Sequence, residues 1–171
     1  MLGRQLLLTD SIEGEEEGRT SIATTHSDQG VYTLRGQCPS GEKGRLGAFM
    51  QYKNVEQSAL ENNSFRRVLF TNKHSQVVLM SLPPGERIGL EVHEGGDQVL
   101  VFVKGAGRAV VGGETHDIGV GDLFAVPAGA EHDFINTGSE DLKLFTVYSP
   151  PEHPDGVVHA TKADALAHPE E

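Results

Sequence analysis

Short apolar runs separated by turn residues dominate the chain from about residue 48 onward. The runs are four to seven residues long and rich in Val, Leu and Phe, a pattern typical of β-strands. Turn sequences such as Pro83-Pro84-Gly85 and Gly112-Gly113 stand between them. Strands at this near-regular spacing indicate an all-β sandwich or barrel. The predicted strands are Arg67–Phe70, Gln76–Leu82, Ile88–His93, Gln98–Val103, Arg108–Val111, Leu123–Val126, His132–Ile135 and Leu142–Tyr148.

The segment Gln98–Lys104 is apolar on both faces of its predicted strand. Leu100 and Phe102 alternate along one face, and three valines occupy the other. Both faces are therefore expected to be covered. In one small barrel, the second cover would be a partner subunit or the N-terminal extension, because an uncovered valine patch is an association site. We therefore expect a homodimer.

Residues 1–47 have a different composition. They are rich in Gly, Ser, Thr, Glu and Gln, and their apolar residues follow neither a strand nor a helix period. Such a segment cannot bury enough apolar surface to offset its loss of conformational entropy. We predict a disordered or loosely docked extension with one short strand at Val31–Leu34, followed by a barrel over residues 48–150. A tail over residues 151–171 follows, with a short helix at Lys162–Ala167.

Composition narrows the classes of partner. With 14 Lys and Arg against 25 Asp and Glu among 171 residues, the formal charge is −11, which argues against a nucleic-acid partner. The single cysteine, Cys38, excludes an intrachain disulfide and a multi-cysteine zinc site. The longest apolar run, Val99–Val103, is far shorter than the roughly 18 residues of a membrane-spanning helix. The apolar patch Leu6–Leu8 is too short for a secretion signal, so we expect a cytoplasmic protein without a membrane partner.

Side chains with metal-ligating atoms occur in three of the predicted strand blocks. Glu91 and His93 are two residues apart in one predicted strand and would project from the same face. The next turn delivers Gln98 to the start of the following strand, and His132 opens a third. Inside a barrel, these nitrogen and oxygen donors could converge on one cation. Taken singly, each has a simpler explanation: a histidine packed in the barrel, a solvated glutamate or an ordinary polar glutamine.

Two spaced motifs within Gly85–Asn136 resemble those of the cupin superfamily. The second motif, Gly-x5-Pro-x-Gly-x2-His-x3-Asn, is complete, whereas the first has Glu91 in place of a histidine and Gln98 in place of a glutamate. The matching positions are Gly85, His93 and Gly105 in the first motif and Gly121, Pro127, Gly129, His132 and Asn136 in the second. The resemblance covers about Phe65 to Tyr148. The tail is similar to that of small single-domain cupins often called mannose-6-phosphate-isomerase-like.

The resemblance implies a cupin-type β-barrel, also described as a double-stranded β-helix or jelly roll. It also implies that Glu91, His93, Gln98 and His132 hold one divalent transition metal, with the negative ligand moved to a different corner of the site. Two imidazole nitrogens and two oxygens suit Fe, Mn, Ni, Zn or Co and do not distinguish among them. Four protein ligands on a six-coordinate ion would leave two positions for water or a small-molecule ligand.

An open metal site indicates a metal-dependent enzyme acting on a small oxygenated metabolite, such as a sugar phosphate or a carboxylate, by isomerisation or dioxygenation. The alternative is a non-catalytic cupin that binds or senses a small ligand, because one fold serves both uses. The sequence shows no clear general base, and Tyr148 is the candidate for a catalytic hydroxyl. His153 and His159 are expected at the surface unless the tail folds over the mouth of the barrel.

Overall fold

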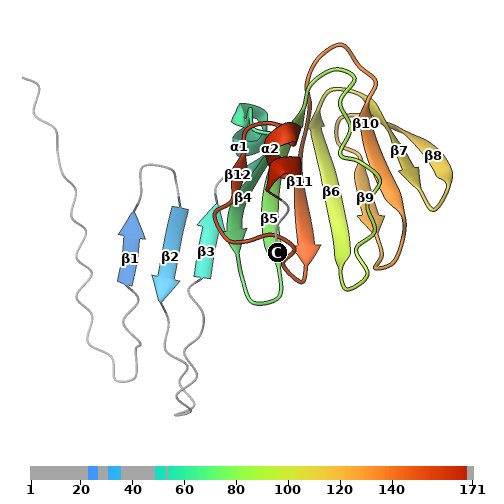
Figure 1. Cartoon of the computed structure of the whole chain (residues 1–171). Coiled ribbons are helices and arrows are strands. Elements are labelled where there is room, and N and C mark those ends of the chain that lie inside the picture. The colour runs from blue at the N-terminus through green and yellow to red at the C-terminus, as the bar shows by residue number, and fades with distance from the viewer. Residues whose placement is uncertain (1–22, 27–30, 36–48, 53, 169–171) are drawn as a thin grey trace, which may run out of the picture. The chain divides into compact units, whose positions relative to one another are not determined.

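The computed structural model describes residues 23–26, 31–35, 49–52 and 54–168. The chain divides into two compact units, residues 1–53 and residues 54–171. Strands make up most of the elements in both units (Figure 1), which confirms the predicted all-β class. None of the helices in the described part of the chain is long and apolar enough to cross a membrane.

The first unit contains a three-stranded antiparallel sheet in the order β1-β2-β3. Its strands are β1 (Ala23–His26), β2 (Val31–Arg35) and β3 (Phe49–Tyr52). β2 contains the strand predicted at Val31–Leu34, whereas the sequence does not predict β1 and β3, because runs of four residues are too short for an apolar period to register. Apart from β1 and β2, the predicted disordered or loosely docked extension lies outside the described residues, and its boundary at residue 47 stays a prediction.

The second unit is built from two antiparallel sheets (Figure 1). Six strands form one sheet in the order β12-β4-β5-β11-β6-β9, and three form the other in the order β10-β7-β8. The strands are β4 (Arg66–Thr71), β5 (Gln76–Leu82), β6 (Asp97–Lys104), β7 (Gly107–Val111), β8 (Glu114–Ile118), β9 (Leu123–Val126), β10 (His132–Asn136), β11 (Leu142–Ser149) and β12 (Val158–His159). Seven of the eight predicted strands are present, each within one residue of its predicted bounds.

The prediction of a strand at Ile88–His93 is wrong. This segment is a loop held beside β10 by isolated bridges, one at Arg87 just before it and one between Glu91 and His132. Gly89 has a φ of 122°, a backbone conformation that L residues in strands do not adopt, so a regular strand cannot pass through it. The loop still brings its polar side chains to the barrel, because the bridges hold it against β10.

Two short helices flank the strands of the second unit. They are α1 (Val55–Glu61) and α2 (Lys162–Ala167), and α2 has the bounds that the sequence predicts. α2 begins with a capping box in which Thr161 and Asp164 bind each other's backbone N–H groups, which explains why so short a helix has a defined start. The sequence does not predict α1, whose buried contribution is limited to Ala59.

The core lies between the two sheets, and β6 shows how its faces are used. The inward face of β6 carries Leu100 and Phe102, which are fully buried. On the outward face, Val103 packs with Ala59 of α1, while Val99 stays partly exposed. Helix α1 therefore covers one end of this outward face. The partner subunit expected to cover the rest stays a prediction.

Candidate metal centre

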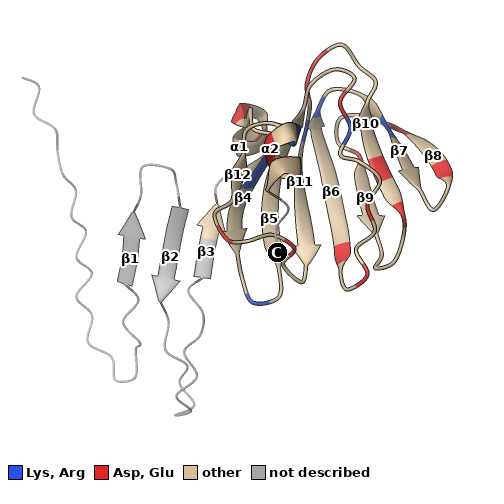
Figure 2. Ribbon diagram, viewed as in Figure 1, with Lys and Arg blue, Asp and Glu red and all other residues tan. Residues whose placement is uncertain are grey.

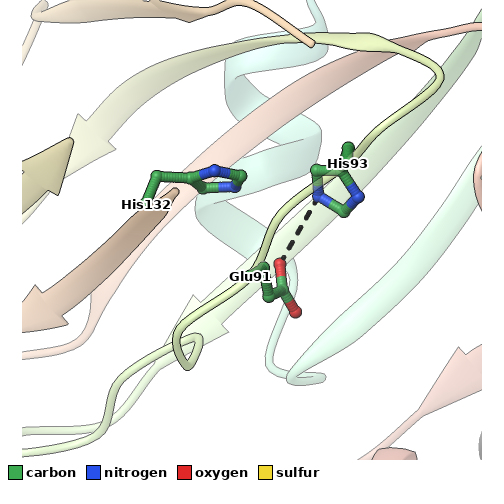
Figure 3. Close-up of side chains that lie close together, drawn as sticks. All are labelled: Glu91, His93 and His132. Carbon is green, nitrogen blue, oxygen red and sulfur yellow. Dashed lines mark ion pairs between the residues drawn. The ribbon is translucent and has the colours of Figure 1, made fainter. Parts of the chain in front are cut away.

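The described part of the chain brings Glu91, His93 and His132 together at one end of the barrel. One ligand atom from each of these residues lies within 4.8 Å of the others. Figure 3 shows the three side chains around a common space. The bridge between the loop and β10 sets their positions, because the N–H of Glu91 donates to the carbonyl of His132 at 2.9 Å and the reverse bond is 3.0 Å. Two of the three residues come from a loop, so their convergence rests on this bridge and not on strand alternation.

The ring of His132 is oriented by a single backbone contact. Its Nδ1 lies 2.8 Å from the carbonyl oxygen of Ala130, which can only accept, so Nδ1 carries the proton. Nε2 then has a lone pair, and this buried atom has no hydrogen-bond partner among the described residues. A histidine held through Nδ1 with Nε2 left as an acceptor is the usual arrangement of a metal ligand.

His93 is arranged in the same way, with a carboxylate in place of the carbonyl. Its Nδ1 lies 3.1 Å from Oε1 of Glu152, and its buried Nε2 lies 3.6 Å from Oε2 of Glu91, beyond hydrogen-bond distance. The neighbouring Glu91 carboxylate is the main cause that raises the pKa of His93; burial opposes this effect and Glu152 adds to it. A metal cation at this place would therefore compete with the proton that His93 takes up, because the same carboxylates attract both.

Gln98 opens β6 at the same end of the barrel and is fully buried. Its Nε2 donates to Oγ1 of Thr146 at 3.2 Å, and that hydroxyl donates in turn to the carbonyl of Val99 at 3.0 Å. These two hydrogen bonds leave Oε1 of Gln98 buried without a hydrogen-bond partner in the described part of the structure. Gln98 pairs across the sheet with Tyr148, whose ring lies edge-on to that of His93 with centroids 5.4 Å apart.

The donor set fits a divalent transition ion. Three buried acceptor atoms, Nε2 of His93, Nε2 of His132 and Oε1 of Gln98, have no hydrogen-bond partner among the described residues. Each such atom costs about 1–3 kcal/mol, so three in one region call for an explanation. Imidazole nitrogens with a carboxylate and an amide oxygen suit Fe, Mn, Ni, Zn or Co. Glu91, 26 % exposed at its side chain, would supply the negative charge.

Comparison with known proteins decides the family. Residues 78–148 match the family model described as a cupin domain. The crystal structure of BH2720 from Bacillus halodurans superposes with a TM-score of 0.68 at 41 % identity, covering 68 % of this chain and 93 % of that one. This chain belongs to the cupin family. The resemblance noted in the sequence and the expected fold are therefore confirmed.

Two curated relatives add to this assignment. The uncharacterized protein YrkC of Bacillus subtilis (strain 168) is 45 % identical over 120 residues, 67 % of this chain. The match covers 64 % of YrkC, so this cupin spans less than two thirds of that relative's length. A protein of Thermotoga maritima named oxalate-binding protein is 34 % identical over 76 residues, which are 44 % of this chain and 63 % of that protein.

A pocket of about 400 Å³ opens beside the donor cluster of this cupin. Its polar lining consists of Arg66, Glu91, His93, Glu152, His153 and Lys162. Its apolar lining consists of Phe65, Ile88, Val92, Ala165 and Leu166. β4, the loop over residues 88–93, the tail and α2 all contribute, so segments far apart in sequence meet here.

The tail of the cupin folds against the barrel, which corrects the expected surface position of two histidines. His153 lines the pocket and His159 is buried in β12. Burial is the main cause that lowers the pKa of His153 to about 3, and the charge of Arg66 adds to it. The ring of His153 is therefore neutral near neutral pH. Tyr148 is buried between the rings of His93 and His153; its catalytic role stays a prediction.

The sequence analysis does not predict two acidic residues at the site. Glu152 holds His93 from the tail, and no spacing rule links it to the motifs. Asp133 is fully buried, forms an ion pair with Arg87 and accepts a hydrogen bond of 2.9 Å from the N–H of Gly89. It thereby anchors the loop that carries Glu91. The signal in the sequence is its place beside His132 in an otherwise buried strand, where an acidic residue needs a partner.

Proposed function

We propose that this cupin binds one divalent transition metal through Glu91, His93, Gln98 and His132 and presents it to a small, oxygen-rich metabolite. The observation that carries the proposal is the cluster of Glu91, His93 and His132, in which the buried Nε2 atoms of both histidines have no hydrogen-bond partner among the described residues. The buried Oε1 of Gln98, which also has no such partner in the described part of the structure, supports it. The metal identity is left among Fe, Mn, Ni, Zn and Co, because this donor set suits all of them.

The charge of the pocket favours an acidic metabolite. Its lining includes two cations, Arg66 and Lys162, and two carboxylates, Glu91 and Glu152, which cancel. A divalent ion would then leave an excess of two positive charges. The rest of the chain is strongly acidic, with a net charge of −11, and Figure 2 shows acidic residues on several strands and loops of the second unit. The Thermotoga maritima relative, named oxalate-binding protein, supports a carboxylate as the class of ligand.

Turnover of the metabolite is the more specific form of this proposal. A bound ion of this kind supplies Lewis-acid polarisation or oxygen activation, as isomerases and dioxygenases require. Glu152 favours turnover, because its side chain lines the pocket, is 41 % exposed and can hold a proton beside His93. The alternative, a cupin that binds or senses the metabolite without changing it, uses the same metal and pocket.

The test begins with elemental analysis of protein purified without chelator, followed by metal removal and titration with Mn, Fe, Ni, Co or Zn. We expect about one ion per chain. His132→Ala should weaken binding at least about 100-fold, since loss of an outer-shell partner alone costs roughly 10–100-fold. The matched control is His116→Ala, because His116 is exposed in β8. A protein that holds less than about a tenth of an equivalent under every metal contradicts the proposal.

The loaded protein then separates the two forms of the proposal. A turnover screen with small carboxylates and sugar phosphates, carried out with the metal found, should reveal an isomerase or dioxygenase activity. Glu152→Gln should lower the rate of such an activity, because the variant keeps the shape of the side chain but cannot take up a proton at neutral pH. Metal-dependent binding without turnover by the wild-type protein would favour the binding or sensory alternative.

A further inference from the structure

Lys162 lines the pocket as the first residue of α2. Its Nζ donates to the carbonyl of Arg87 at 2.8 Å and lies 3.6 Å from Oε1 of Glu86. An ammonium group has three N–H donors, so these two neighbours leave capacity for a further acceptor. The side chain is 23 % exposed, which keeps it within reach of the pocket contents.

The ammonium of Lys162 lies against the loop that carries Glu91 and His93. Nζ of Lys162 lies 3.9 Å from the place that a Cβ on Gly89 would occupy. Glu91 follows two residues later, and two residues of chain span at most about 7 Å. A cation and a metal-ligating carboxylate therefore stand roughly one small molecule apart along the same wall of the pocket.

Most of the apolar lining comes from the same loop and from α2. Ile88 and Val92 contribute from the loop, and Ala165 and Leu166 contribute from α2. Hydroxyl groups placed against such a wall would lose hydrogen bonds to water, whereas methylene groups would not. The lining therefore suits a hydrocarbon spacer better than the ring of a sugar.

We propose that the metabolite is a short dianion with one acidic group at the metal and a second acidic group, carboxylate or phosphate, on Lys162. This inference rests on the proposed function and specifies its ligand. Arg66, whose Nη2 lies 3.9 Å from Oε1 of Glu91, adds positive charge at the metal end. The volume of about 400 Å³ is within the ordinary range of small-molecule pockets.

The test measures binding of paired acids to Mn-loaded protein by calorimetry at constant ionic strength. Succinate and glutarate should bind more tightly than butyrate and valerate, which keep one carboxylate and a similar spacer. Lys162→Met should weaken binding of the diacids about tenfold, as expected for one charge-assisted hydrogen bond, and leave the monoacids nearly unchanged. Phosphoglycolate tests whether the second acidic group is a phosphate. If phosphoglycolate binds more tightly than succinate, and Lys162→Met also loses this binding, then the group on Lys162 is a phosphate.

The matched control is Lys104→Met, because Lys104 ends β6 far along the strand from Gln98 and pairs with Glu140. Equal losses for diacids and monoacids in Lys162→Met, or equal affinities of the two classes for the wild-type protein, would overturn the assignment. Mn binding measured before any acid is added separates the two proposals. Absent binding of Mn and of the other four metals contradicts the proposed function, whereas intact Mn binding without discrimination contradicts only the role of Lys162.

Discussion

The two ends of the barrel interior differ in chemistry. The same strands contribute to both: β6 carries Gln98 and Phe102, and β10 carries His132 and Phe134. At one end the rings of Phe102 and Phe134 pack with centroids 5.7 Å apart, and at the other the rings of His93 and His132 lie 5.2 Å apart. We call these regions the apolar end and the polar end.

Burial has opposite consequences at the two ends. Removing the phenylalanines from water is favourable, at roughly 25 cal/mol per Å² of apolar surface. At the polar end, burial leaves acceptor atoms of His93, Gln98 and His132 without hydrogen-bond partners among the described residues, which is unfavourable. The apolar end therefore stabilises the fold, and the polar end is the candidate metal centre.

Two buried glutamines make the same comparison between residues of one type. Gln76 has both ends of its amide satisfied: Oε1 accepts from the backbone of Glu152 and His153, and Nε2 donates to Oγ1 of Thr71 and to the carbonyl of His153. Gln98 is satisfied only at Nε2. Gln76 thus ties the tail to β5, whereas Gln98 keeps an oxygen available inside the barrel.

The largest expected effect is on stability at the apolar end. Phe134→Ala should lower the free energy of unfolding by about 3–5 kcal/mol, because it removes a fully buried ring and leaves a cavity. Urea denaturation of the chelator-treated protein measures the effect. Leu123→Ala is the control, since Leu123 is 60 % exposed and should cost little. A loss below about 1 kcal/mol for Phe134→Ala would show that the apolar end is not the main source of stability.

The fold is largely predictable because its signals are local. The apolar runs that become β5 and β9 have the predicted bounds, and the Gly112-Gly113 turn separates β7 from β8 as expected of a two-residue hairpin. The failures are also local in origin. β8 carries only one buried residue, so its sequence shows no strand period, and the loop through Gly89 is apolar without being a strand.

The cluster of Glu91, His93 and His132 is predictable from the sequence, whereas its surroundings are not. Motif spacing identifies His93 and His132, and the structure places both beside Glu91. The ring orientations depend on Glu152 and on the carbonyl of Ala130, which come from parts of the chain outside any spacing rule. The pocket depends on α2 and the tail, whose docking is a tertiary property.

A smaller effect on stability, which depends on whether metal is present, is expected at the polar end. Gln98→Glu should lower the free energy of unfolding of the metal-free protein by about 1–3 kcal/mol, because a carboxyl replaces a fully buried amide. Excess Mn should reduce this loss, since the new carboxylate is a stronger ligand than the amide. Thermal melts with chelator and with Mn measure both states.

Gln76→Glu is the matched control for this prediction. It should destabilise the protein equally with chelator and with Mn, because a carboxylate cannot donate the two hydrogen bonds that Nε2 of Gln76 makes. If Gln98→Glu behaves like Gln76→Glu, with the same loss in both states, then Gln98 is not a metal ligand. The polar end would then resemble an ordinary buried network.

The smallest expected effect is the pH dependence contributed by His153. Its pKa is lowered from 6.5 to about 3 in the folded protein, chiefly by burial, so between these values the unfolded chain binds a proton that the folded chain does not. Stability therefore falls as the pH falls from about 6.5 toward 3. Between pH 7 and pH 5, the wild-type protein should lose about 1 kcal/mol more than His153→Gln, a value reduced for the partial exposure of the ring. Urea denaturation of chelator-treated protein at both pH values measures this difference.

His116→Gln, at an exposed position of β8, is the control and should follow the wild type. Parallel losses in the wild-type protein and in His153→Gln would show that the tail leaves His153 in contact with water and does not seal this side of the pocket.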